Sequence, residues 1–185
     1  MAIHKKELAI VKEYYTRTSL QFENLQNEAE QYADSLYNSS DFRYYMDADV
    51  SAEWAHERGL ERYDMLLVMK SNHTCMTISM LYQIWEQQLI RFTNRELEHY
   101  FQLDKRYLTY SEIQKVFNLH GVNICDTSSW KKIRELKLLV NVIKHGNGDS
   151  AERLRRARPD FFNRPGTDND TLRFRGAVLT DAHSL

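Results

Sequence analysis

Apolar and aromatic residues recur every three or four positions near the start of the chain. This spacing places them on one side of an α-helix and leaves the polar residues between them on the solvent side. The pattern predicts one helix from about Lys5 to Asn38, with a buried stripe of Leu8, Val11, Tyr15, Phe22, Leu25, Ala29, Tyr32 and Leu36. The turn and capping residues of Asn38–Asp49 end the pattern.

Two further helical patterns follow. Ser51 is suited to cap a helix that runs to about Lys70. The second pattern covers Ser71–His99, where one stripe contains Met76, Met80, Ile84, Leu89 and Phe92. Because no glycine or proline occurs between Leu60 and Leu119, the two patterns alternatively form one rod, in which we expect a kink near Ser71–Asn72.

Shorter helices are predicted in the remainder of the chain. Glycine or proline marks the end of each one, because these residues stop helices. The expected segments are Ser111–Leu119 before Gly121, a helix through Trp130 that is capped by Asp126, Thr127 or Ser128 and ends at His145, and Asp149–Arg158 before Pro159. From Asn163 the sequence is loop-like, although Leu172–Leu179 also fits a short strand.

These patterns predict an all-α fold: an up-and-down bundle of five or six helices over residues 1–160, followed by a loop-like tail over 161–185. Only 6 glycines and 2 prolines occur in 185 residues, which favours long helices. The aromatic face of the N-terminal helix is larger than one small bundle needs, and this excess favours a homodimer.

The helix ending at His145 has two contrasting faces. Its apolar stripe comprises Trp130, Ile133, Leu136, Val140 and Ile143, widened by Leu139 and Val142. Arg134, Asn141 and His145 fall within about 40° of one another on another face. Lys137 and Lys144 flank that face. Glu86, inside an earlier apolar run, is expected either on a polar side or buried with a partner.

Residues Val140–Gly146, which read VNVIKHG, resemble a motif of the HEPN superfamily of small α-helical bundles. Many members carry Arg, a polar residue often Asn, three variable residues and His near the end of a late helix. Asn141, His145 and Gly146 match that pattern, whereas Val140 stands in the arginine position. The helical region around Leu81–Phe92 also looks like the earlier helices of such bundles.

The resemblance implies a metal-independent endoribonuclease of a defence or toxin–antitoxin system, acting as a dimer without a cofactor. His145 would then transfer protons as the general acid or base. Asn141 would orient it, Lys144 with Arg134 would contact phosphate, and Lys137 would help to bind RNA. Either an antitoxin or another defence-system protein would be the partner.

The alternative hypothesis is a module without catalytic activity. Because Val140 supplies no charge, the same face would instead bind RNA, a nucleotide or a partner protein without turnover. Asn141 and His145 would otherwise only cap the helix carbonyls. The arginine-rich segment from Arg153 to Arg175 is read either as a solvated tail or as an RNA contact.

Charge and cysteine content exclude several other classes. The net charge of −1 gives no overall signal for nucleic acid. Cys75 and Cys125 have neither the spacing of zinc ligands nor a disulfide framework, so we expect no metal site. No apolar run is long enough to span a membrane. Without a visible signal peptide, these features predict a cytoplasmic protein.

Overall fold

The computed structural model describes residues 2–39, 47–101, 108–162, 170, 172–173 and 176–179. This part of the chain contains helices and no strand, so the all-α prediction is confirmed. The α-helices are α1 (Ala2–Ser19), α2 (Leu25–Tyr37), α4 (Ala48–Glu98), α5 (Tyr110–Leu119), α6 (Ser128–His145) and α7 (Asp149–Ala157). Short 3-10 helices cover Leu20–Phe22, Ile124–Asp126 and Pro159–Phe161.

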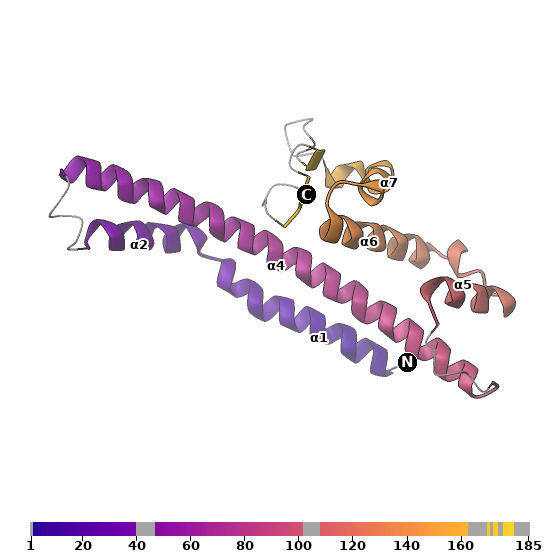
Figure 1. The fold of residues 1–185 in the computed structure, drawn as a ribbon. Helices are drawn as coiled ribbons and strands as arrows, with labels where there is room; N and C mark the ends of the chain where they lie inside the picture. Colours follow the sequence, from indigo (N-terminus) through magenta and orange to yellow (C-terminus); the bar gives the residue numbers. More distant parts are fainter. Residues whose placement is uncertain are drawn as a thin grey trace.

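The 51-residue helix α4 is the spine of the molecule. At 1.5 Å per residue it spans about 76 Å. Figure 1 shows α1 and α2 following one another along one side of α4, while α6 and α7 lie on the other side. Both predicted patterns over residues 51–99 therefore belong to one rod.

No break occurs in α4 at the expected kink near Ser71–Asn72. The polar residues that follow stay within the helix, and their hydroxyls donate to the carbonyl four residues earlier. Thr74 donates to Lys70 O at 3.2 Å, and Thr77 donates to His73 O at 2.8 Å. Ser79 does the same to Cys75 O at 3.0 Å.

The prediction of one N-terminal helix from Lys5 to Asn38 is wrong, because α1 ends at Ser19 and α2 starts at Leu25. Contacts with α4 explain the break, which no glycine or proline marks. The ring of Phe22, in the connecting turn, packs 5.4 Å from the ring of His73 on α4. Tyr15 stacks on the same His73 ring at 5.4 Å. Thr18 Oγ1 lies 2.5 Å from His73 Nε2.

Helices α2 and α4 approach each other closely through small residues. A Cβ atom built on Gly59 would lie 3.0 Å from the Cβ of Ala33 and 3.4 Å from the carbonyl oxygen of Ala29. Ala29 and Ala55 are buried on the two facing sides. Because these side chains are short, the two backbones pack tightly along this stretch.

The main core lies where α6 and α7 cover α4. Its buried members are Cys75, Leu138, Val142, Ile143, Ala151, Leu154, Phe162, Leu172 and Val178. Three of them, Phe162, Leu172 and Val178, come from the segment expected to be a loop-like tail. The expected strand over Leu172–Leu179 is absent from its described residues, since 172–173 are helical and 176–179 are irregular.

Candidate functional site

Helix α6 carries every residue that the sequence singled out for chemistry. Thr127 caps its start, because its hydroxyl accepts a hydrogen bond from Trp130 N at 3.2 Å. The helix ends at His145 and is followed by Gly146, which has a φ of 69°, a conformation that side chains rarely adopt. Both the start and the end of α6 agree with the sequence prediction.

Asn141, Lys144 and His145 lie close together at the C-terminal end of α6. Asn141 is half-buried, whereas Lys144 and His145 are exposed. Within the described residues, neither the Asn141 amide nor the His145 ring makes a hydrogen bond or an ion pair. Because Asn141 and His145 are four residues apart, their side chains are neighbours on the helix surface. Both side chains are therefore free to meet a ligand.

Val140, which stands where the HEPN motif has arginine, is buried in α6. Only 1% of its surface is exposed. Ile143, three residues further along the same stripe, is also buried, at 3% exposure. The α6 position that matches the motif therefore points into the protein and offers no charge to the exposed pair.

Lys137 interacts with an aromatic cluster rather than with Asn141 and His145. Its Nζ lies 4.0 Å from the centre of the Tyr110 ring on α5, within the range of a cation–π interaction. Tyr110 stacks on Trp130 with ring centres 5.6 Å apart. Trp85 of α4 packs edge-on against both rings, so this cluster joins α4, α5 and α6.

Glu86 of α4 borders this aromatic cluster. It is half-buried and accepts a hydrogen bond from the Tyr82 hydroxyl at 2.9 Å, so the alternative of burial with a partner describes it better. Burial and the Glu86 carboxylate raise the pKa of Tyr110 to about 12, with a further contribution from Cys125. Burial and the same carboxylate also raise the pKa of Tyr82.

Arg134 lies at the other end of α6. It is exposed and lines a groove of about 270 Å³ at the start of the helix, together with Cys125, Asp126, Thr127, Ser128, Trp130 and Lys131. Eleven residues separate Arg134 from His145, which corresponds to about 16 Å along the helix axis. The structure thus separates the five predicted site residues into three places.

Arg155 of α7 is a central residue that the sequence analysis did not single out. Its Nη1 donates to Asn147 Oδ1 and to Glu152 Oε1, both at 2.9 Å. Its Nε donates to Asp170 Oδ2. The side chain is only 10% exposed. Arg155 therefore connects Asn147, in the turn after His145, with Asp170 of the C-terminal segment.

One sequence signal pointed to part of this arrangement: Glu152 and Arg155 are three residues apart, a spacing that suits an ion pair on a helix. Asp170 is distant in sequence and carried no such signal. Burial would raise the Asp170 pKa, but the hydrogen bonds from Arg155 and from Arg173 N, with both positive charges, hold it below its ordinary value.

Gly146 and Gly176 bring the C-terminal segment against the end of α6. The amide of Asn147 donates to Gly176 O at 3.0 Å. A Cβ on Gly146 would lie only 2.0 Å from the same oxygen. The absence of a side chain at Gly146 therefore permits both the positive φ after the end of α6 and the close approach of residues 176–179.

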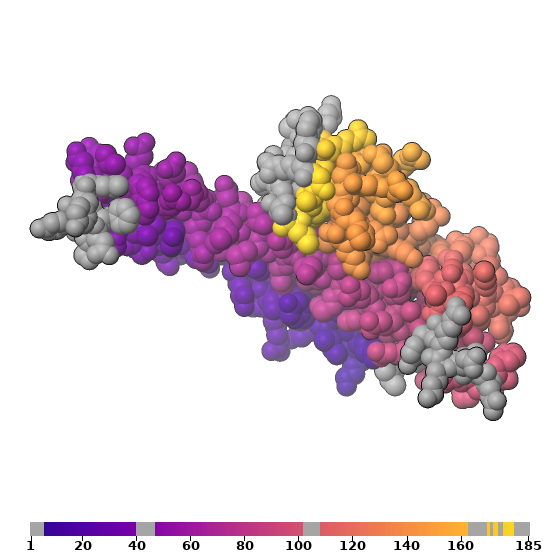
Figure 2. Space-filling model, viewed as in Figure 1, coloured from indigo at the N-terminus to yellow at the C-terminus, as the bar shows by residue number. Residues whose placement is uncertain are grey.

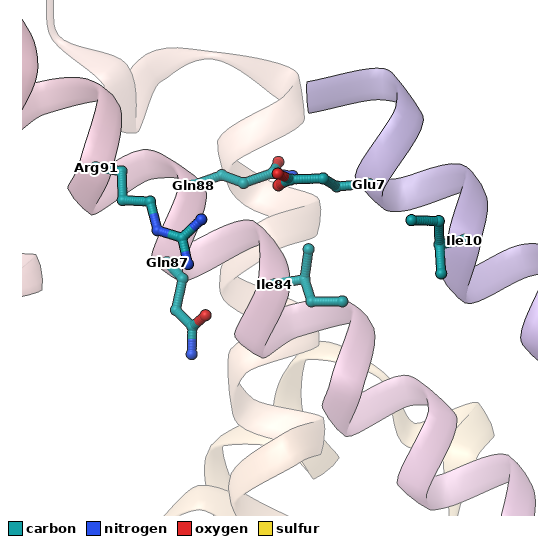
Figure 3. A pocket seen from close by; sticks show the side chains of 6 residues that line it. All are labelled: Glu7, Ile10, Ile84, Gln87, Gln88 and Arg91. Carbon is teal, nitrogen blue, oxygen red and sulfur yellow. The ribbon is translucent and has the colours of Figure 1, made fainter. Parts of the chain in front are cut away.

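Two other grooves lie along α4. Figure 3 shows the first, between α1 and α4, where Gln88 reaches across to Glu7 while Arg91 and Gln87 lie beside it on α4. This groove measures about 250 Å³, and Gln88 Nε2 donates to Glu7 Oε2 within it. The second, of about 340 Å³, lies between α2 and α4 and includes Gly59, Leu60 and Tyr63. No group of three His, Cys, Asp or Glu in the described ranges is placed to hold a metal ion.

No protein family, curated protein or solved structure matches the chain. Among the described helices, none has both the length and the apolar character needed to cross a bilayer.

Proposed function

We propose that the chain is a non-catalytic helical module that binds RNA through the exposed face of α6. The burial of Val140 carries this proposal. Cleavage of RNA by the motif needs a cation near the histidine, because negative charge develops on the phosphate in the transition state. The motif position that would supply this cation faces the core instead.

Three cations of α6 and α7 do not replace the missing one. Lys137 lies over the Tyr110 ring, and Arg134 is about 16 Å from His145 along the helix. Arg155 is bound by Asp170, Glu152 and Asn147. Lys144 alone remains beside His145. The site therefore favours binding of a phosphate backbone over its cleavage.

Exposed positive charge around α6 supports RNA as the ligand. Residues 108–162 contain ten Lys and Arg but only six Asp and Glu. Within the described residues, seven of these cations are exposed and make no ion pair: Lys115, Lys131, Lys132, Arg134, Lys144, Arg153 and Arg156. Unpaired surface cations attract a polyanion and release its counterions on binding.

Fluorescence anisotropy with a labelled single-stranded RNA tests this proposal. We expect the affinity to fall as salt rises, with a slope that decreases by about 0.7 for each phosphate contact removed. The Arg134→Gln, Lys144→Gln variant should lose affinity and show the smaller slope. The matched control, Lys6→Gln with Lys12→Gln on α1, should bind like the wild type. Equal binding by both variants would rule out the α6 face.

A metal-independent endoribonuclease is the second candidate, and the free neighbouring side chains of Asn141 and His145 favour it. An exposed imidazole suits proton transfer at a ribose hydroxyl. Incubation of purified protein with total RNA in EDTA, beside His145→Ala, tests this activity. Cleavage by the wild type alone would replace the binding proposal, whereas persistent cleavage by His145→Ala would identify a contaminant. The antitoxin or other defence-system partner and the cytoplasmic location remain proposals that rest on the sequence.

A further inference from the structure

One end of the molecule consists of α2 and residues 48–70 of α4, which we call the arm. Figure 2 shows this purple end extending past the orange α6–α7 region, so that its upper side is left uncovered by that region. In the described part of the chain, α2 packs on one side of this stretch of α4. A helix with a neighbour on one side only keeps an open face on the other.

The open face of the arm continues the face of α4 that α6 and α7 cover. Eighteen residues make five full helical turns, so residues eighteen apart point the same way. Cys75, Ser79 and Tyr82 are buried in the covered half, where Cys75 contacts the core with Leu138 and Val142. Eighteen residues earlier, the equivalent positions are Glu57, Glu61 and Asp64.

This open face is acidic and has apolar side chains at its edges. The arm contains eight Asp and Glu but only three Lys and Arg. Glu53, Glu57 and Asp64 are exposed and make no ion pair with any described residue. Val50, at 52% exposure, lies on the same side, and Leu60, at 54%, lies at the edge of that side beside the groove between α2 and α4. Such a surface repels RNA and suits a cationic protein surface.

The chain itself contains a complementary surface. The region from α5 to α7, which we call the basic unit, carries the seven exposed and unpaired cations described above. The basic unit lies on the same side of α4 as the open face of the arm, but further along the helix (Figure 1). Each molecule thus has a step: a raised basic unit next to a lower acidic arm.

We propose that two copies of the chain interlock, with the basic unit of each copy docked on the acidic arm of the other. A two-fold axis relates the two contacts. Each acidic arm therefore contacts a basic unit, and neither an arm nor a basic unit stays unoccupied in the dimer. Residues 48–70 present a strip about 34 Å long and about 10 Å wide. Two such contacts bury about 1,400 Å² in total, which lies within the range of stable dimers.

This arrangement regulates RNA binding, a consequence that rests on the proposed function. The arm of the partner covers cations of the α6 face that would otherwise contact phosphate. Self-association and RNA binding therefore compete, and an RNA chain displaces the acidic arm.

Charge reversal tests the dimer on the full-length chain by sedimentation velocity at low salt. The wild type should be a dimer that dissociates as salt rises, because the contacts are electrostatic. An arm variant (Glu53→Lys, Glu57→Lys, Asp64→Lys) and a basic-unit variant (Arg134→Glu, Lys144→Glu, Arg153→Glu) should each be monomeric. An equimolar mixture of the two should form a one-to-one heterodimer, because both contacts then pair opposite charges.

A matched control places the same change of charge away from the arm. Glu13→Lys, Glu96→Lys and Glu98→Lys together should leave the dimer intact, with helix content measured by circular dichroism for every variant. A monomeric wild type, a dimeric arm variant, or a mixture that stays monomeric overturns the proposal.

RNA anisotropy separates this proposal from the proposed function. The monomeric arm variant should bind RNA more tightly than the control variant that carries the same change of charge, because only the arm variant has lost the competing dimer contact. Absence of RNA binding in every form, together with a heterodimer in the mixture, would sink the proposed function and leave the interlocked dimer standing.

Discussion

At the scale of single residues, Val140 is the position that distinguishes the two proposed functions of α6. Its side chain is buried, with only 1% of its surface exposed. We expect Val140→Arg, which would complete the resemblance to the HEPN motif, to lower the free energy of unfolding by about 3–5 kcal/mol, because it buries a charge without a partner. Urea unfolding measures this loss. A variant as stable as the wild type would mean that the arginine reaches the surface, and it should then be assayed for cleavage.

Gly146 and Gly121 differ in how close the C-terminal segment comes to them, and Gly146 also has a ψ of −142°, outside the left-handed helical region. Both have positive φ, of 69° and 73°. A Cβ on Gly146 would collide with Gly176 O, whereas a Cβ on Gly121 would meet nothing within 4 Å. Gly121→Ala should therefore cost only the backbone strain, about 1 kcal/mol.

Gly146→Ala should cost more than Gly121→Ala and should also release residues 176–179. Hydrogen exchange at the Asn147 amide reports this release, because that amide donates to Gly176 O. Equal losses of stability in the two variants, with unchanged exchange at Asn147, would show that the contact contributes nothing.

At the scale of elements, the ion pair of Arg155 and Asp170 connects α7 with the C-terminal segment. The pKa of Asp170 is held below its ordinary 3.8. A carboxyl whose pKa is lower in the folded state stabilises the fold above the unfolded pKa and loses this effect as the pH falls through the folded pKa. The wild type should therefore be more stable than Asp170→Asn at neutral pH. The difference should shrink below pH 3.8, as measured by urea unfolding across that range.

The helices that local signals mark were predictable from the sequence. Gly146 and Thr127 define α6, and the 3.6-residue pattern places Val140 on its buried side. The break after Ser19 was not predictable, because the apolar stripe continues across it and the contact of Phe22 with His73 belongs to the tertiary fold. Leu138 fell outside the predicted stripe yet is buried, since the core surrounds more of α6 than one packed helix would cover.

The candidate site was predictable only as a helix face. Periodicity puts Arg134, Asn141 and His145 on one side of the helix, but it carries no information on what covers that side. Lys137 meets Tyr110 from α5. Arg155 meets Asp170 from fifteen residues away. Contacts between helices that are distant in the sequence depend on how the helices pack. The spacing of residues within one helix does not predict that packing.

At the scale of the whole molecule, α4 makes the protein elongated. A compact chain of 185 residues has a radius of gyration of about 16 Å. Since α4 alone spans about 76 Å, small-angle X-ray scattering should give a clearly larger radius and a maximum dimension of at least that length. The monomeric arm variant is the proper sample. A radius near the compact value would mean that the rod folds back on itself.

The unbroken course of α4 has a mechanical consequence. Its one glycine, Gly59, is pressed against Ala33, and the helix contains no proline, so no hinge separates the two halves. The arm is then a lever: a tilt of one degree at the base of a 34 Å lever moves its tip by about 0.6 Å. Any ligand that tilts the spine where α6 and α7 rest on it displaces the far end of the molecule, without a change of conformation in between.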